Sequence, residues 1–249
     1  SIRWLSSSAS SKGSTVSPTA VALVAAAAAS AQTRPFRLDD MAAFRSITDA
    51  AVSPDGTHVV FAVRRTILAE NRMETDLWSV RVDGSTPARQ VTFDKASESS
   101  LKWAPDGSRL AFLADRDGTR QVWALPVGGG EAIKLTTHSE SIAAFDWSPD
   151  GKEVAIAGAP AKTEEEKRRE REKDDGFLLG EQWRNHRIWI GKRELTDGRL
   201  HVRALAWSPE GRSIAVSVAP NAEADASEDA KGQLIDVESG QARDIPGAD

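Results

Sequence analysis

Cysteine is absent from this chain of 249 residues. Disulfides, thiolate nucleophiles and thiolate metal sites are therefore excluded, while the compartment stays open because many exported proteins also lack cysteine. A basic stripe is missing as well, since 32 Lys and Arg stand against 37 Asp and Glu and give a net charge of −5. Phosphate binding requires clustered Lys and Arg, so we expect no nucleic-acid partner.

Signature motifs of catalysis are also lacking. The sequence has no G-x-S-x-G nucleophile elbow and no H-E-x-x-H zinc motif. The stretch "VGGGEAIKL" has no Lys-Ser/Thr of a phosphate loop and leads into an expected strand. The four histidines stand at different phases of the repeat described below, which argues against a shared metal ion; they are His58, His138, His186 and His201. We therefore assign no catalytic, cofactor-binding or metal-binding residue in this chain and expect no cofactor.

One short stretch, Asp115-Arg116-Asp117-Gly118, resembles a carboxylate cluster. It falls where a connection between two expected strands belongs, and Asp and Gly are typical turn residues. We favour a turn over the alternative of a metal site.

The first 31 residues differ from the rest in composition. They hold no acidic residue, only Arg3 and Lys12 as basic ones, and then the apolar run "AVALVAAAAA" followed by Ala29-Ser30-Ala31. This layout is typical of a secretory signal peptide with a small-x-small cleavage site. The alternative is a membrane anchor, but a span needs about 20 apolar residues. We therefore predict a signal peptide at 1–31, a secreted or periplasmic protein, and no stable membrane insertion.

One sequence pattern recurs four times along the chain. Its copies are "AVSPDGTHVVFAV", "LKWAPDGSRLAFLA", "FDWSPDGKEVAIAG" and "LAWSPEGRSIAVSV". The equivalent positions Ser53, Ala104, Ser148 and Ser208 are 51, 44 and 60 residues apart. Periods of about 40–50 residues fit four-stranded propeller blades better than helical repeats of about 33–34 residues.

The centre of each copy predicts a tight turn between two antiparallel strands. Pro149 presets φ at the second turn position, Asp150 favours the bridge region, and Gly151 can adopt the left-handed conformation that closes the turn. The flanks alternate with period two and are rich in Val, Ile, Phe and Trp, which indicates strands. The strand after each turn is apolar on both faces, as expected when neighbouring sheets cover both sides.

A tryptophan precedes the turn proline by two positions in three of the copies. These residues are Trp103, Trp147 and Trp207, while Val52 takes that place in the first copy. Because buried aromatic side chains mostly pack, we expect these tryptophans in the core between blades rather than against a ligand.

We therefore predict an all-β fold, a β-propeller with WD40-like or TolB-like blades of four antiparallel strands within residues 32–249. About four blades are expected, and they form an incomplete ring. The expected blades span about 44–93, 97–137, 141–196 and 201–245. The third contains a charged insertion at 160–187 and the fourth an acidic, flexible surface loop at 219–232. The short "IWIGKRELTDG" raises the alternative that the third blade is defective.

The charged insertion contains an arm at 161–175 with six basic and seven acidic residues. Glu164–Arg168 and Glu165–Arg169 are pairs at i,i+4 that support a short solvated helix. Balanced charge and the lack of an apolar face favour a solvated arm. The alternative is an arm that projects toward a partner domain.

Taken together, these segments resemble a known family. The four "SPDG"-type turns, the "LW" and "VW" third strands, the charged insertion and "HVRALAWSPEG" are similar to the N-terminal β-propeller of secreted S9-family serine peptidases, the prolyl oligopeptidase superfamily. Within that superfamily the resemblance is to the acylaminoacyl-peptidase or dipeptidyl-peptidase-like branch, with this chain truncated before the hydrolase domain.

The resemblance implies a non-catalytic propeller that gates substrate entry in an exported peptidase cleaving short peptides. Its partners would be a peptide substrate and an α/β-hydrolase domain that carries the Ser/Asp/His triad. The glutamates that anchor a substrate amine in some dipeptidyl peptidases have no clear counterpart, because Glu164, Glu165 and Glu166 lie in the charged arm. The alternative is a stand-alone exported TolB-like or WD40-like propeller that binds proteins. The sequence leaves the oligomeric state open.

Overall fold

The structure, a computed structural model, describes residues 37, 40, 43–173, 184–223 and 229–246. The chain divides into two units, residues 1–41 and 42–249, and all the strands described below belong to the second. The predicted signal peptide at 1–31 lies outside the described residues.

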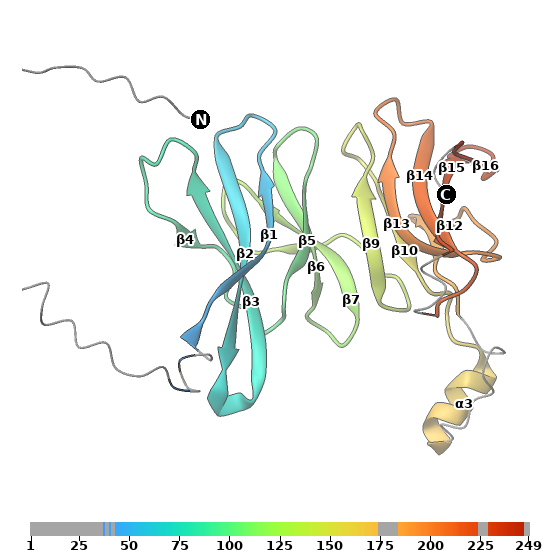
Figure 1. Cartoon of the computed structure of the whole chain (residues 1–249), viewed down its shortest axis with the longest axis horizontal. Coiled ribbons are helices and arrows are strands. Elements are labelled where there is room, and N and C mark those ends of the chain that lie inside the picture. The colour runs from blue at the N-terminus through green and yellow to red at the C-terminus, as the bar shows by residue number, and fades with distance from the viewer. Residues whose placement is uncertain (1–36, 38–39, 41–42, 174–183, 224–228, 247–249) are drawn as a thin grey trace, which may run out of the picture. The chain divides into compact units, whose positions relative to one another are not determined.

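Four antiparallel sheets of four strands each make up the second unit (Figure 1). Sheet 1 contains β1 (Ser46–Val52), β2 (His58–Ile67), β3 (Arg72–Arg81) and β4 (Arg89–Gln90). Sheet 2 contains β5 (Ser99–Trp103), β6 (Arg109–Asp115), β7 (Arg120–Pro126) and β8 (Ile133–Lys134). Sheet 3 contains β9 (Ile142–Trp147), β10 (Val154–Gly158), β11 (Arg187–Ile190) and β12 (Arg193–Glu194). Sheet 4 contains β13 (His201–Trp207), β14 (Ser213–Ala219), β15 (Lys231–Asp236) and β16 (Ala242–Asp244).

Among the described residues, two short helices lie between strands, a 3-10 turn at Leu68–Glu70 and α3 at Glu164–Glu172. The third sheet has its full set of four strands, so the alternative of a defective third blade is wrong. The segment expected as one acidic loop at 219–232 also includes strand residues at both ends, because β14 extends to Ala219 and β15 begins at Lys231.

Each repeated turn has the predicted geometry. Gly56, Gly107, Gly151 and Gly211 adopt φ of 70°, 69°, 67° and 78°. In each turn the glycine N–H donates to the carbonyl three residues earlier at 2.8–2.9 Å, which closes the turn. The serine copies add a side-chain bond; in the third copy the N–H of Glu153 donates to Ser148 Oγ at 3.0 Å.

Successive turns also contact one another in the same way. A Cβ built on Gly107 would lie 3.6 Å from Pro54 Cδ, and one on Gly151 would lie 3.4 Å from Pro105 Cδ. The fourth turn repeats the relation, since a Cβ on Gly211 would lie 3.8 Å from Pro149. The four turns are therefore equivalent corners of successive sheets, as a propeller requires.

We expect Gly151→Ala to lower the free energy of unfolding by about 1–2 kcal/mol, because an L side chain is strained in the left-handed region. The new methyl group would also press on Pro105 of the preceding turn. Gly128→Ala is the matched control, since nothing lies within 4 Å of its added Cβ and its φ is not positive. Urea unfolding of both variants measures the difference; equal stabilities would contradict the turn assignment.

Apolar side chains fill the three spaces between successive sheets. Alternate residues of β6 point in opposite directions: Leu110 and Phe112 pack with sheet 1, whereas Ala111 and Leu113 pack with sheet 3. Residues of β10 and β14 fill the third space together. The prediction that the second strand of a blade is covered on both faces is therefore confirmed for sheet 2.

The tryptophans before the turns lie between the sheets, but they are not equivalent. Trp103 donates its indole N–H to the carbonyl of Ala51 at 3.2 Å, and Trp147 donates to Lys102 at 3.1 Å, in each case on the preceding sheet. Trp207 instead donates to Gly211 in its own turn. Trp147 is buried, while the other two are half-buried.

Two aspartates connect first strands of neighbouring sheets. Asp49 of β1 accepts a hydrogen bond from the N–H of Leu101 on β5 at 2.8 Å. Asp146 of β9 accepts from the ammonium of Lys102 at 2.9 Å and from the N–H of Trp207 at 2.7 Å, and so joins sheets 2, 3 and 4. These contacts place the first strand of each sheet beside the first strand of the next.

The sheets do not close into a ring within the described residues. Sheet 1 and sheet 4 stand at the two ends of the series (Figure 1). The predicted fold, an incomplete β-propeller of four-stranded antiparallel blades, is confirmed.

Candidate functional site

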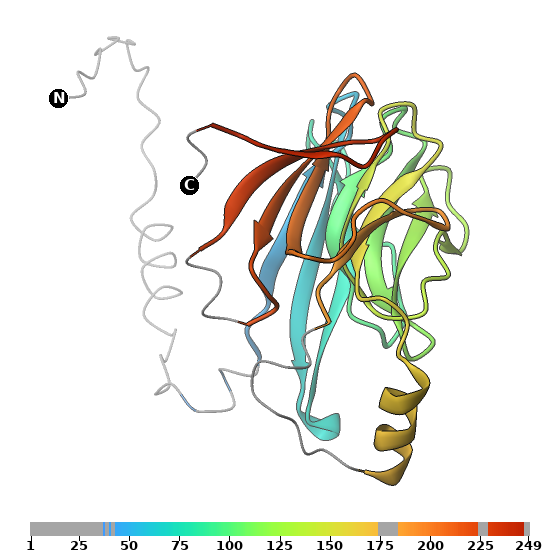
Figure 2. The ribbon, with the colours of Figure 1, turned by 90° about the vertical axis from the view of Figure 1, so that its right-hand side faces the viewer.

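The connections between the second and third strands gather at the end of the sheets away from the repeated turns (Figure 1). They comprise the β2–β3 hairpin, the β6–β7 turn, and the β10–β11 connection that contains α3. The hairpin and α3 extend furthest in both ribbon views (Figures 1 and 2). We take this loop end as the candidate functional site, because functional groups concentrate on connections held by a rigid scaffold.

Local sequence explains where α3 begins. Thr163 accepts a hydrogen bond from the N–H of Glu166, and the Glu166 carboxylate accepts from the N–H of Thr163, which forms a capping box. This contact to the Thr163 backbone lowers the pKa of Glu166. The helix ends at Glu172, and the next residue, Lys173, adopts a left-handed conformation.

The ion pairs on α3 differ in part from the predicted ones. Glu165–Arg169 forms at 3.5 Å as predicted, but Glu164–Arg168 does not. Arg168 pairs with Glu165 at 2.6 Å, and Glu164 pairs with Lys167 at 2.8 Å. The i,i+3 partners are within reach on the same helix face and compete for the same charges.

The arm is attached to the propeller at its base. The guanidinium of Arg184, just before β11, lies 3.4 Å from the carboxylate of Glu140 in the β8–β9 connection and 3.5 Å from that of Glu166 on α3. Lys162 pairs with Glu170 at 2.7 Å, and its N–H donates to Glu140. The carboxylates of Glu164 and Glu165 remain largely exposed on the helix.

An ionic cluster with buried carboxylates lies along the β2–β3 hairpin and the connection that follows it. Its acids are Glu74, Asp76 and Glu98, and its bases are Arg65, Arg72 and Arg116. Burial raises the pKa of Glu98 to about 8 even though Arg116 lies 3.3 Å away. Sequence reasoning missed this cluster, although the charges inside "RMETDLW" in an expected strand were a signal, since charges are rarely buried unless paired.

The Asp115–Gly118 stretch is a turn between β6 and β7, as predicted. Arg116 points back to the sheet 1 side, where it pairs with Asp94 at 2.8 Å and stacks on Trp123 at 4.9 Å. Asp117 pairs with Lys134 on β8. Arg116 and Asp117 of this turn are therefore each paired with an oppositely charged side chain of the protein.

The structure brings two of the four histidines together, which the repeat spacing did not indicate. His186 and His201 have ring centroids 4.4 Å apart, and the backbone N–H of His186 donates to the ring Nδ1 of His201 at 3.1 Å. His138 lies apart from this pair, against Trp189. Burial and the neighbouring His186 lower the pKa of His201 to about 4.

We expect this histidine pair to make the protein less stable as the pH falls from about 6.5 toward 4. The folded His201 binds a proton less readily than the unfolded one, so protons favour unfolding in that window. Glu98 acts in the opposite sense, because its raised pKa favours the folded state at lower pH. The comparison is therefore made between the natural chain and His201→Gln. The urea concentration at the midpoint of unfolding should fall further between pH 7 and pH 5 for the natural chain than for His201→Gln. An identical fall in both would contradict the assignment.

The described residues contain no group of three or more His, Cys, Asp or Glu placed to hold a metal ion. Within the same residues, no helix has the length and apolar character needed to cross a bilayer. The loop end thus offers charged projections on a rigid scaffold, which suit contact with another molecule.

Comparison with known proteins agrees with this architecture. The family model described as the TolB beta propeller domain matches residues 32–179. A Bacillus subtilis protein named as the uncharacterized peptidase YuxL is 30% identical over 142 residues, which cover 56% of this chain and 21% of that protein. Dipeptidyl-peptidase 5 of Porphyromonas gingivalis is 32% identical over 108 residues, or 43% of this chain and 16% of that enzyme.

A solved structure supports the fold. The acylaminoacyl peptidase of Pyrococcus horikoshii superposes with a TM-score of 0.57 at 17% identity over 82% of this chain and 33% of that one. The chain spans about a fifth of the length of the curated relatives named here, and it is related to propeller regions of proteins named as peptidases. With more than half of its residues matched by the family model, the chain belongs to the TolB beta propeller domain family.

Proposed function

We propose that this chain is the non-catalytic propeller of an exported serine peptidase, in which it restricts entry to short peptides. The observation that carries the proposal is the similarity to proteins named as peptidases, each of which extends far beyond the matched region. The loop end supports it, since the β2–β3 hairpin and α3 project from a rigid scaffold toward one side.

On this proposal the partners are a peptide substrate and an α/β-hydrolase domain that supplies the catalytic triad. Dipeptidyl-peptidase-like or acylaminoacyl-peptidase-like cleavage of short peptides is the corresponding activity. Neither nucleic acid nor stable membrane insertion forms part of it. The signal-peptide pattern at 1–31 supports export to the periplasm or beyond.

A second candidate is a stand-alone exported propeller that binds other proteins. The family description favours it, because the matching model is named for TolB rather than for a peptidase. The two candidates differ in what the gene encodes beyond Asp249.

Reading the genomic DNA that follows the codon for Asp249 separates them. The peptidase proposal predicts an open frame that continues into a G-x-S-x-G motif, because the α/β-hydrolase nucleophile sits on such an elbow. An in-frame stop codon immediately after Asp249, seen in independent isolates, would reject that proposal and favour the binding module.

A further inference from the structure

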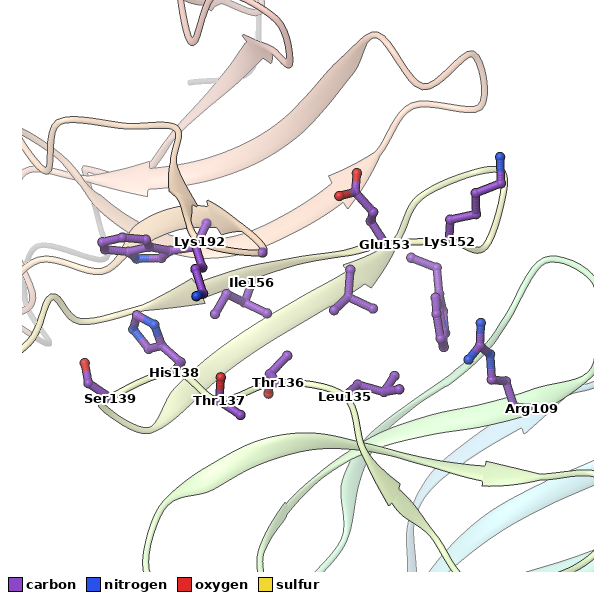
Figure 3. Close-up of a pocket in the computed structure, with 14 residues that line it drawn as sticks. Arg109, Leu135, Thr136, Thr137, His138, Ser139, Lys152, Glu153, Ile156 and Lys192 are labelled. Atoms are coloured by element: carbon purple, nitrogen blue, oxygen red, sulfur yellow. The ribbon is translucent and has the colours of Figure 1, made fainter.

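A cavity of about 570 Å³ lies between sheets 2 and 3 (Figure 3). Its walls come from the segment after β8, from β10 and β11, and from the turn between β11 and β12. Ligand pockets for small organic molecules have volumes of about 300–1,000 Å³, so this cavity is large enough to hold one.

A positively charged side chain stands at each end of the cavity. Figure 3 shows the ammonium group of Lys192 directed into the space at one end. At the other end the guanidinium group of Arg109 lies over the ring of Trp147, 4.9 Å from its centre, and donates to the carbonyl of Gly151 at 3.0 Å. The ammonium of Lys152 and the carboxylate of Glu153 point away from it. In the part of the chain that the structure describes, neither Lys192 nor Arg109 makes an ion pair. The cavity is thus cationic within a chain of net charge −5.

The rest of the cavity surface is largely apolar. Leu135, Val154 and Ile156 line it together with the rings of Trp147 and Trp189. Two donors at its edge are buried without a hydrogen-bond partner, Nε1 of Trp189 and Nε of Arg109. Both atoms are covered by neighbouring side chains, Trp189 by the ring of His138 and Arg109 by that of Trp147, so a ligand in the cavity does not reach them.

The wall beside Lys192 is held in place before any ligand arrives. The buried amide of Gln121 binds both the N–H and the carbonyl of His138, at 2.9 Å each. The ring of His138 donates from Nε2 to the carbonyl of Ala159 at 2.7 Å. A Cβ on Gly158 would lie 2.9 Å from that ring, so glycine is needed for the close approach. Such preorganisation reduces the entropic cost of binding.

We propose that this cavity binds an organic carboxylate with an apolar body. The carboxylate is placed at the end where the ammonium group of Lys192 provides the donors. The apolar body packs on Ile156, Val154 and the ring of Trp147. The carboxylate is supplied by a free small acid or by the C-terminus of a peptide. An inorganic anion would use the charge but leave the apolar wall exposed, and a cation would be repelled.

The test uses N-acetyl-L-phenylalanine and its amide as matched probes, which differ only in the carboxylate. The signals of the indole N–H groups in a proton–nitrogen NMR spectrum report binding, and Trp189→Phe and Trp147→Phe assign two of the eight tryptophans. We expect the acid to shift these two signals with a Kd on the order of 1 mM, as suits a ligand of this size. The amide should bind at least about tenfold more weakly.

Variants locate the carboxylate. Lys192→Met should weaken binding of the acid about tenfold. Lys95→Met is its control, because Lys95 is exposed and does not line the cavity, and it should leave the Kd unchanged. Melting temperatures confirm that each variant folds.

The tripeptide Ala-Ala-Phe and its amide identify the source of the carboxylate. Tighter binding of the tripeptide acid than of the acetylated amino acid assigns the site to peptide C-termini, and equal binding assigns it to small free acids. Equal binding of acid and amide, equal Kd values for Lys192→Met and Lys95→Met, or no shift of either indole signal would overturn the proposal.

Discussion

Replacing Trp147 with alanine is expected to lower the free energy of unfolding by about 3–5 kcal/mol, the loss typical of large aromatic truncations in cores. Its side chain is 6% exposed and packs in the apolar cluster between sheets 2 and 3. Its indole N–H also donates to the carbonyl of Lys102 at 3.1 Å, and the guanidinium of Arg109 lies 4.9 Å from the centre of its ring. The variant would lose packing, an inter-sheet hydrogen bond and a cation–π contact together.

Trp207→Ala is the matched control for this prediction. Trp207 holds the same position in its repeat, but it is only half-buried and its indole N–H bonds within its own turn. We expect a clearly smaller loss, because no hydrogen bond between sheets is removed. Urea unfolding followed by circular dichroism measures both. A melting shift near zero for Trp147→Ala would show that the strand places this residue on an exposed face.

The fold could be predicted because its main features are encoded locally. The Pro-Asp-Gly turns need a proline φ and a left-handed glycine within four residues, and the alternation beside them fixes the strands. Gly151 at φ 67° and the two-sided packing of β6 both follow from such short patterns. The repetition then determines the architecture, because each sheet needs a neighbour on each face.

Features that depend on tertiary contacts could not be predicted in the same way. His186 and His201 are 15 residues apart and meet only because the last strands of sheet 3 and the first of sheet 4 lie together. Trp207 shares its sequence position with Trp147 yet bonds differently, because Asp146 takes its backbone N–H and its indole turns to Gly211.

The cavity between sheets 2 and 3 illustrates the same limit. Arg109 and Lys192 are far apart in sequence, and nothing in their local patterns sets them apart from other surface charges. Their shared position depends on the stacking of two sheets and on the direction of each side chain. On the helix, Glu164–Arg168 was a reasonable pair by spacing, but Glu165 was a nearer partner for Arg168.

The second large effect is expected at the uncovered face of sheet 1. Strand pairing places Ile47 opposite Val63 and Val52 opposite Val59, so these four side chains share one face. The opposite face, with Val60 and Ala62, packs on sheet 2. Ile47 and Val52 are 67% and 59% exposed. In a closed propeller another blade would cover this apolar face.

This chain alone should therefore self-associate through sheet 1, because exposed apolar patches of several hundred Å² tend to bind one another. The double variant Ile47→Lys/Val52→Lys places two charges on the face and should shift the chain toward monomer. Leu68→Lys is the control, since Leu68 is 64% exposed on the β2–β3 turn, away from this face. It should leave the association unchanged.

Sedimentation velocity of the chain across a wide concentration range tests the central claim, that successive sheets shield one another and sheet 1 lacks its neighbour. We expect association that grows with concentration, falls in the double lysine variant and persists in Leu68→Lys. A single sharp monomer boundary at every concentration, together with one cooperative melting transition, would contradict it and indicate a self-sufficient small propeller.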